Sequence, residues 1–208
     1  MENYFKLTSE SKVNIFGVTL FRIELTVDCK WGKAGDKGGW IESEKLANGD
    51  ARVYGNAWVY GDAEVYGDAR VSGNAWVSGD ARVSGNARVS GNAWVSGDAE
   101  VYGDARVYGN ARVYGNARVY GNARVSGDAE VSGNARVYGD AWEESPLQIQ
   151  GTKHFVNICA KGKLKIGCYE LEIDAWLNKF ESIGEKEGYT PKQIKEYGLY
   201  IKLAKELS

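Results

Sequence analysis

The sequence from Ala51 to Val71 reads Ala-Arg-Val-Tyr-Gly-Asn-Ala-Trp-Val-Tyr-Gly-Asp-Ala-Glu-Val-Tyr-Gly-Asp-Ala-Arg-Val, and its six-residue pattern decides the fold. The unit Gly-(Asn/Asp)-Ala occurs sixteen times between Gly49 and Gly139 without a change of register. Ala and Val stand two positions apart, so an extended strand points both toward one face and the residues beside Val toward the other. Glycine followed by Asn or Asp supplies the residue types that most readily adopt positive φ. Each hexad therefore predicts a short strand, with small aliphatic residues inside, followed by a corner.

Three such corners close a triangle, which predicts coils of eighteen residues. The outward residues sort into columns at this spacing. The first column is Arg52, Arg70, Arg88, Arg106 and Arg124, ending in Trp142; the second is Trp58, Trp76, Trp94, Arg112 and Glu130; the third is Glu64, Arg82, Glu100, Arg118 and Arg136. We therefore expect a mainly β protein in which residues 49–142 form a parallel β-helix of triangular eighteen-residue coils.

The hexads resemble those of the hexapeptide-repeat proteins, which form left-handed parallel β-helices. In that class an aliphatic residue opens each hexad and a small residue follows four positions later, as Val53 and Ala57 do here. The resemblance implies a left-handed coil. The period by itself does not fix the hand, because crossover connections are usually right-handed.

The flanking segments have other patterns, and we expect them to cap the open ends of the β-helix. In the segment 1–48, residues 18–27 alternate apolar and polar side chains and predict a strand. In the segment 147–208, residues 154–160 and 164–170 predict a hairpin. A helix follows with apolar residues at helical spacing from Ile173 to Ile183, and a last helix opens with the capping box Thr190-Pro191-Lys192-Gln193. The C-terminal segment is thus expected to be a small α+β module.

Over nearly its full length the chain resembles a group of bacteriophage and prophage proteins. The residues that carry this resemblance are Gly35-Asp36-Lys37-Gly38-Gly39-Trp40-Ile41-Glu42, the hexads, Leu147-Gln148-Ile149-Gln150-Gly151, Ile166-Gly167-Cys168, and Gly188-Tyr189-Thr190-Pro191 with Gln193-Ile194. The resemblance implies a viral or prophage origin, and hence the cytoplasm of a host cell. It brings no reaction with it.

The composition gives limits on the environment and the partners. The formal net charge of −2 does not favour a nucleic acid or an acidic membrane surface as partner. No run approaches the roughly 18 apolar residues of a membrane span, and the N-terminus lacks the basic start and apolar stretch of a secretory signal. Three cysteines without a CxxC pair are typical of reduced thiols in a cytoplasm, and Cys159 and Cys168, in apolar strand patterns, are expected to be buried.

The histidine content limits the chemistry. Hexapeptide β-helices are often acyltransferases in which a histidine acts as general base, and the γ-type carbonic anhydrases among them need three histidines for zinc. This chain has one histidine, His154, outside the repeats. We therefore expect no metal, no cofactor and no catalytic residue. An acyltransferase with His154 as base is the alternative.

Two outward columns are candidate binding surfaces. Trp58, Trp76 and Trp94, with Tyr60 beside them, form an aromatic strip that favours an interface, although tryptophan ladders also stabilise sheets by cross-strand pairing. The arginines of the first column (Arg52, Arg70, Arg88, Arg106 and Arg124) are candidate anion contacts. An Asp or Asn two residues before each arginine makes nucleic acid the less favoured partner.

Together these patterns favour a non-enzymatic binding or assembly protein of phage type. We expect a homo-oligomer that contacts a host or phage protein, or that sequesters a small ligand. Antagonism of a host defence component is a use that the origin alone suggests.

Overall fold

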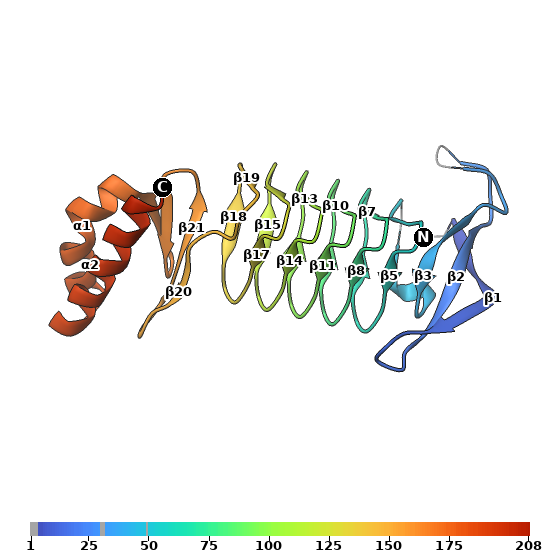
Figure 1. Ribbon diagram of the computed structural model, residues 1–208, viewed down its shortest axis with the longest axis horizontal. Helices are drawn as coiled ribbons and strands as arrows, with labels where there is room; N and C mark the ends of the chain where they lie inside the picture. The colour runs from blue at the N-terminus through green and yellow to red at the C-terminus, as the bar shows by residue number, and fades with distance from the viewer. Residues whose placement is uncertain (1–3, 30–31, 49) are drawn as a thin grey trace.

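The molecule is an elongated stack of coils with a different cap at each end (Figure 1). The computed structural model describes residues 4–29, 32–48 and 50–208. Gly49, the first glycine of the predicted repeat, and the N-terminal residues 1–3 lie outside the described residues. The described chain begins in a two-stranded cap, passes through the coils, and ends in a sheet covered by two helices (Figure 1).

The coils are eighteen residues long, as the sequence predicts. As far as Tyr138, each pairs with the next in a parallel register of eighteen, for example Trp58 with Trp76 and Val59 with Val77. The tryptophan face contains β3 (Lys37–Ile41), β5 (Trp58–Val59), β8 (Trp76–Val77), β11 (Trp94–Val95), β14 (Arg112–Val113) and β17 (Glu130–Val131). The arginine face contains β4 (Arg52–Val53), β7 (Arg70–Val71), β10 (Arg88–Val89), β13 (Arg106–Val107), β16 (Arg124–Val125) and β19 (Ala141–Trp142). The mixed face contains β6 (Glu64–Val65), β9 (Arg82–Val83), β12 (Glu100–Val101), β15 (Arg118–Tyr120) and β18 (Arg136–Tyr138).

The interior of the stack is made of alanine and valine. Every alanine from Ala57 to Ala135 and every valine from Val59 to Val137 is completely shielded from solvent. Backbone bonds between coils flank these residues: the amide of Trp76 donates to Ala93 O at 2.9 Å, and the amide of Ser78 donates to Val95 O at 3.0 Å. The predicted parallel β-helix is therefore confirmed, while its left hand remains an implication of the resemblance.

The corners depend on glycine alone. No described residue other than glycine has positive φ, so the expectation that Asn and Asp share this conformation is wrong. The Asn side chains instead bond along the stack: Asn74 Nδ2 donates to Asn92 Oδ1 at 3.2 Å, and Asn92 Nδ2 donates to Asn110 Oδ1 at 3.1 Å. The polar corner residue therefore links coils, and the glycine makes the turn.

At the N-terminal end the parallel stack begins before the repeat does. Trp40 and Ile41 of β3 pair with Trp58 and Val59, and the helical turn η1 (Glu44–Leu46) leads to a bridge between Ala47 and Val65. Two antiparallel strands, β1 (Phe5–Val13) and β2 (Thr19–Leu25), extend the same sheet past β3. The strand predicted at 18–27 is thus β2, and β1 was not predicted.

At the C-terminal end the register changes by one residue. Trp142 pairs with Val125 instead of Arg124, because only four residues separate Val137 from Trp142 where five separate the valines of neighbouring hexads. The placement of Trp142 at the end of the outward arginine column is therefore wrong. Its side chain packs against the core of the coils and against that of the C-terminal module.

The C-terminal module closes the stack with side chains that replace a further strand. Gln148 accepts a bond from the amide of Ser132 at 2.7 Å and donates to Glu130 O at 2.8 Å. Asn157 donates to Arg136 O at 2.8 Å. These groups satisfy backbone atoms that the last coil would otherwise leave without partners.

The module itself is a four-stranded antiparallel sheet with two helices on one side (Figure 1). Its elements are β20 (Gln148–Gln150), β21 (Phe155–Ala160), β22 (Lys163–Ile166), β23 (Tyr169–Glu172), α1 (Ile173–Lys186) and α2 (Pro191–Glu206). The second strand of the predicted hairpin divides at Gly167, whose φ is +58°, so Cys168 stands exposed in a turn and was wrongly expected to be buried. Cys159 is buried, and the predicted capping box at Thr190 is present.

The stacked corners generate a prediction about Gly91. Its φ is +69°, and a Cβ there would lie 3.0 Å from both N and O of Gly109, whereas Gly139 has φ of +79° and no neighbour within 4 Å. We expect Gly139→Ala to cost about 1 kcal/mol of stability, the strain of a left-handed alanine. Gly91→Ala should cost at least about 1 kcal/mol more, because the coils must also move apart. Urea denaturation of both variants measures the difference, and equal midpoints would show that corner stacking does not limit the residue.

Candidate interaction surface

The tryptophan face carries a ladder of four indoles. Trp40, Trp58, Trp76 and Trp94 follow one another in register. The rings of Trp58 and Trp76 are stacked at 4.8 Å with an interplanar angle of 7°, and those of Trp76 and Trp94 meet edge to face at 5.6 Å. Trp40 was not among the residues predicted for this column, although it stands eighteen residues before Trp58 and that spacing identifies it.

The N-terminal half of the ladder is covered by the β1–β2 hairpin. Leu20 of β2 forms a small buried core with Trp40 and Tyr60. The Lys12 ammonium lies 4.0 Å from the Trp40 ring centre and 4.3 Å from that of Trp58, a cation–π arrangement. Tyr60 is only 7% exposed, and burial raises its pKa. One of the four residues predicted to line the aromatic strip, Tyr60, therefore lies under the hairpin, because Leu20, forty residues earlier in the chain, folds back over it.

The hairpin tip projects from this face next to the uncovered part of the ladder. Phe16 lies 6.3 Å from the ring of Tyr60 and 6.4 Å from that of Trp76. Phe16 as a whole is nevertheless 56% exposed, and Ile15 and Val13 nearby in the hairpin are 78% and 65% exposed. The tip is thus an apolar projection that is held against the face by the contacts of Phe16 with Tyr60 and Trp76.

Beyond the tip, the face is hollowed around Trp94. A hollow of about 250 Å³ is lined by Trp94, Ser96, Arg112, Tyr114 and Glu130. The carboxylate of Glu130 pairs with Arg112 at 3.4 Å and accepts a bond from the Tyr114 hydroxyl at 3.2 Å. The Trp94 indole N–H is enclosed and has no acceptor within the described chain. This half of the ladder is therefore an aromatic surface with a charged border.

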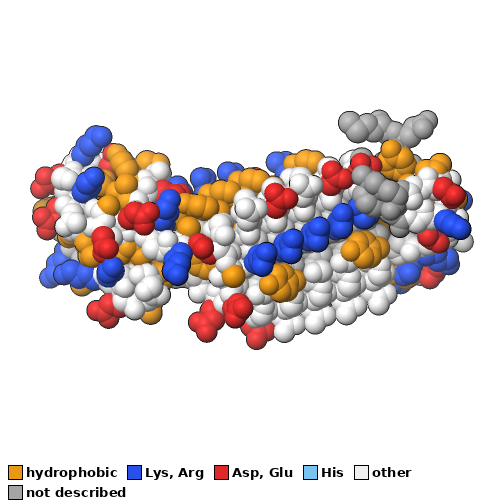
Figure 2. Space-filling view, turned by 90° about the horizontal axis from the view of Figure 1, so that it is seen from above, with side chains coloured by type: hydrophobic (Ala, Val, Ile, Leu, Met, Phe, Trp, Pro, Cys, Tyr) orange, Lys and Arg blue, Asp and Glu red, His pale blue; other side chains and the backbone are white. Residues whose placement is uncertain are grey.

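The arginine face presents a continuous basic row along the coils (Figure 2). Its five arginines are in register from Arg52 to Arg124. Burial and the neighbouring Arg70 lower the pKa of Arg52. Asp68 and Asp104 line a small polar hollow of about 130 Å³ together with the arginines of the middle coils, so carboxylates reduce the positive potential. Contact of this row with an anion stays a prediction.

The mixed face holds a second aromatic ladder, which the predicted columns did not include. Tyr102, Tyr120 and Tyr138 stack with ring centres 5.3 and 5.2 Å apart. The Tyr138 hydroxyl donates to Glu170 of the C-terminal module, and burial together with this carboxylate raises the Tyr138 pKa. The ladder joins the last coil to the module and is therefore structural. The eighteen-residue spacing of the three tyrosines was its signal.

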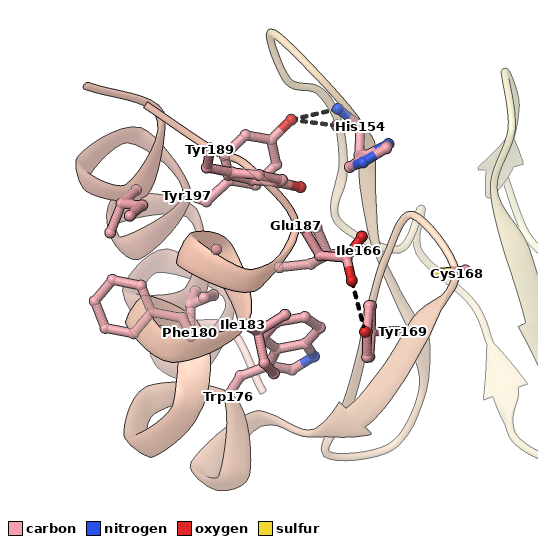
Figure 3. Close-up of a pocket in the computed structure, with 13 residues that line it drawn as sticks. His154, Ile166, Cys168, Tyr169, Trp176, Phe180, Ile183, Glu187, Tyr189 and Tyr197 are labelled. Atoms are coloured by element: carbon pink, nitrogen blue, oxygen red, sulfur yellow. Dashed lines mark hydrogen bonds between the residues drawn. The ribbon is translucent and has the colours of Figure 1, made fainter. Parts of the chain in front are cut away.

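His154 lies in the C-terminal module at the edge of a small pocket (Figure 3). The pocket has a volume of about 30 Å³, far below the roughly 300 Å³ of an ordinary ligand site. The Tyr197 hydroxyl accepts from the backbone amides of Lys153 and His154 and donates to His154 O at 2.8 Å. The hydrogen bonds at this position therefore involve the His154 backbone, and the imidazole packs against Gly167 and Tyr189.

The described residues also limit what else the surface can hold. Among residues 4–29, 32–48 and 50–208, no three His, Cys, Asp or Glu side chains come close enough together to bind a metal ion. Within the same part of the chain, neither helix is long and apolar enough to cross a membrane.

The coils match a family of known repeats. The model of the YdcK Beta solenoid repeat matches residues 63–79, 81–97, 99–115, 105–118, 111–127, 117–130 and 129–145. The chain is a β-solenoid repeat protein. The matched segments lie in and directly after the coils, and both caps fall outside them. A search of curated proteins found no match to the chain.

The bonding of Tyr197 predicts which residue of the pocket matters for stability. We expect His154→Ala to cost no more than about 1 kcal/mol, because the backbone bonds at this position persist. Tyr197→Phe should cost about 1–3 kcal/mol, because it leaves two backbone amides without an acceptor. Urea denaturation compares the two variants, and a larger loss for His154→Ala would contradict this assignment.

Tyr189 predicts a loss of stability at high pH. Burial, followed by the nearby Tyr197 and Glu187, raises the pKa of Tyr189 to about 12, against about 10 in an unfolded chain. The folded state then holds a proton that the unfolded state releases, so stability falls as pH rises from about 10 to about 12. Tyr189→Phe should lose less stability over this range in urea denaturation at pH 9 to 12. Parallel curves for the two proteins would refute the expectation.

Proposed function

We propose that this protein is a non-enzymatic interaction protein whose tryptophan face binds another protein surface. The observation that carries the proposal is the end of the ladder beyond the hairpin tip, where Trp94 follows Trp76 and is bordered by the Arg112–Glu130 ion pair. Protein interfaces commonly have an aromatic centre with a charged rim, and exposed aromatic patches on soluble proteins mark binding sites.

Another copy of the chain is the first candidate partner. Hexapeptide-type β-helix proteins, which the coils resemble, commonly associate through their flat faces, and such association gives a homo-oligomer. The resemblance to phage and prophage proteins favours a host or phage protein as a further partner, met in the cytoplasm of the host cell. Antagonism of a host defence component or sequestration of a small ligand belongs to the same proposal.

The surroundings of His154 support a function without catalysis. The backbone of His154 is held by Tyr197, and its imidazole borders a pocket of only about 30 Å³. A general base must reach its substrate within hydrogen-bond distance, and a pocket of this size does not admit an acyl donor and an acceptor. The alternative of an acyltransferase is therefore the less supported one.

The proposal is tested by the double variant Trp76→Glu and Trp94→Glu. If the face is an interface between copies, light scattering should report a smaller particle than for the natural chain, because like charges then oppose each other across the contact. The fold should persist by circular dichroism, because the Ala and Val interior is untouched. Ser84→Glu with Ser90→Glu is the matched control, since it adds the same charges on the other two faces.

One result would contradict the proposal, and another would change the partner that it names. If the double variant unfolds while the control does not, the tryptophans are a structural ladder and the proposal fails. If the natural chain is a monomer, affinity purification from the host identifies the partner, and the double variant must then fail to retain it.

A further inference from the structure

A projection and a hollow lie next to each other on the tryptophan face. The projection is the β1–β2 tip, with Ile15 as its most exposed apolar residue at 78%. The hollow is the one of about 250 Å³ around Trp94 and Tyr114. Because the Phe16 ring contacts Tyr60 and Trp76, the tip stands above the coils that end just before the hollow begins.

Such a pair of features is self-complementary. A two-fold axis that lies in the plane of contact, runs across the stack of coils and falls between the projection and the hollow carries each feature of one molecule onto the other feature of its partner. On this face the axis falls between the levels of Trp76 and Trp94. Successive coils are about 4.8 Å apart, so the tip, about one coil before the axis, maps to about one coil beyond it, where Tyr114 and Arg112 line the hollow.

We propose that a second copy of the chain docks on the tryptophan face in antiparallel orientation, so that the Ile15 tip of each copy fills the hollow of the other. This inference rests on the proposed function, in which the face is an interface, and it names the partner and the mode of contact. The contact covers the aliphatic tip and the aromatic wall of the hollow together.

The charges on the face agree with the same axis. The Lys12 ammonium lies between the levels of Trp40 and Trp58, about two coils before the axis. The Arg112–Glu130 pair lies about two coils beyond it. The two-fold operation therefore brings the ammonium of one copy to the level of the Arg112–Glu130 pair of the other, in which the Glu130 carboxylate is the group of opposite charge. A parallel arrangement would place projection on projection and leave both hollows open.

Disulfide trapping between two different chains tests this contact. One chain carries Ile15→Cys and the other Tyr114→Cys, both in a background with Cys29→Ser and Cys168→Ser. A mixture of the two under mild oxidation should form a covalent heterodimer. Neither chain alone should cross-link, because the axis keeps two copies of either position about 10 Å or more apart, beyond the reach of a disulfide. Tyr108→Cys is the matched control, since Tyr108 is as exposed as Tyr114, at 40% against 39%, but lies on the arginine face.

Sedimentation equilibrium gives an independent readout. Ile15→Asp should weaken the dimer at least about tenfold, because it places a charge in an apolar contact. Leu199→Asp, at a 59% exposed position of α2, should leave the dimer unchanged. Both side chains are exposed, so neither change disturbs the fold.

The outcomes separate this inference from the proposed function. Cross-linking confined to the Ile15→Cys and Tyr114→Cys mixture supports the two-fold contact. A dimer that is lost in the Trp76→Glu and Trp94→Glu variant but never forms this cross-link overturns the inference and leaves the face an interface. A natural chain that sediments as a monomer at every concentration also overturns the inference, and the proposed function then depends on a different protein partner.

Discussion

The hydrogen bonds between successive coils are the interaction on which the rest of this structure depends. Each bond requires the next coil to lie directly above. The corners permit this because glycine adopts positive φ there and has no side chain that would collide with the glycine eighteen residues away. Uniform corners keep Ala above Ala and Val above Val, so alanine and valine alone fill the interior from Ala51 to Val137. The same constraint aligns the outward residues in columns, and the aromatic and arginine rows follow from it.

A stack of this kind leaves backbone groups without partners at both ends, and the two ends are capped in different ways. At the C-terminal end one residue is missing from the repeat spacing, Trp142 turns toward the core, and Gln148 and Asn157 bond the backbone of the last coil. At the N-terminal end β1 and β2 continue one sheet in antiparallel order. Because that hairpin also folds back along the face, it covers Trp40 and Tyr60 and leaves Trp94 uncovered. The candidate binding surface is thus a product of capping as much as of the repeat.

The outward residues have a different role on each of the three faces. The tyrosine ladder of the mixed face ends on Glu170 and joins the coils to the C-terminal module. The arginines of the arginine face lie among corner carboxylates, which reduce the positive electrostatic potential of the row. Among the described residues, the tryptophan face alone combines an apolar projection, an aromatic wall and a charged border. A solenoid can vary its outward residues in this way because the interior alanines and valines, with the glycine corners, already specify the coil.

The sequence by itself determined the coil length, the inward residues and the sorting of tryptophans and arginines onto separate faces. These features repeat every six or eighteen residues, so local pattern contains all the information that they need. It also located both helices and the capping box at Thr190. Only the tertiary structure decided that glycine alone turns the corners, that Trp142 leaves its column, that Tyr60 is buried and that Cys168 is exposed. Most of these outcomes depend on where a non-repeating segment contacts the repeat. Leu20, for example, packs on Tyr60, forty residues later in the chain, and the periodic pattern of the sequence contains no sign of such a contact.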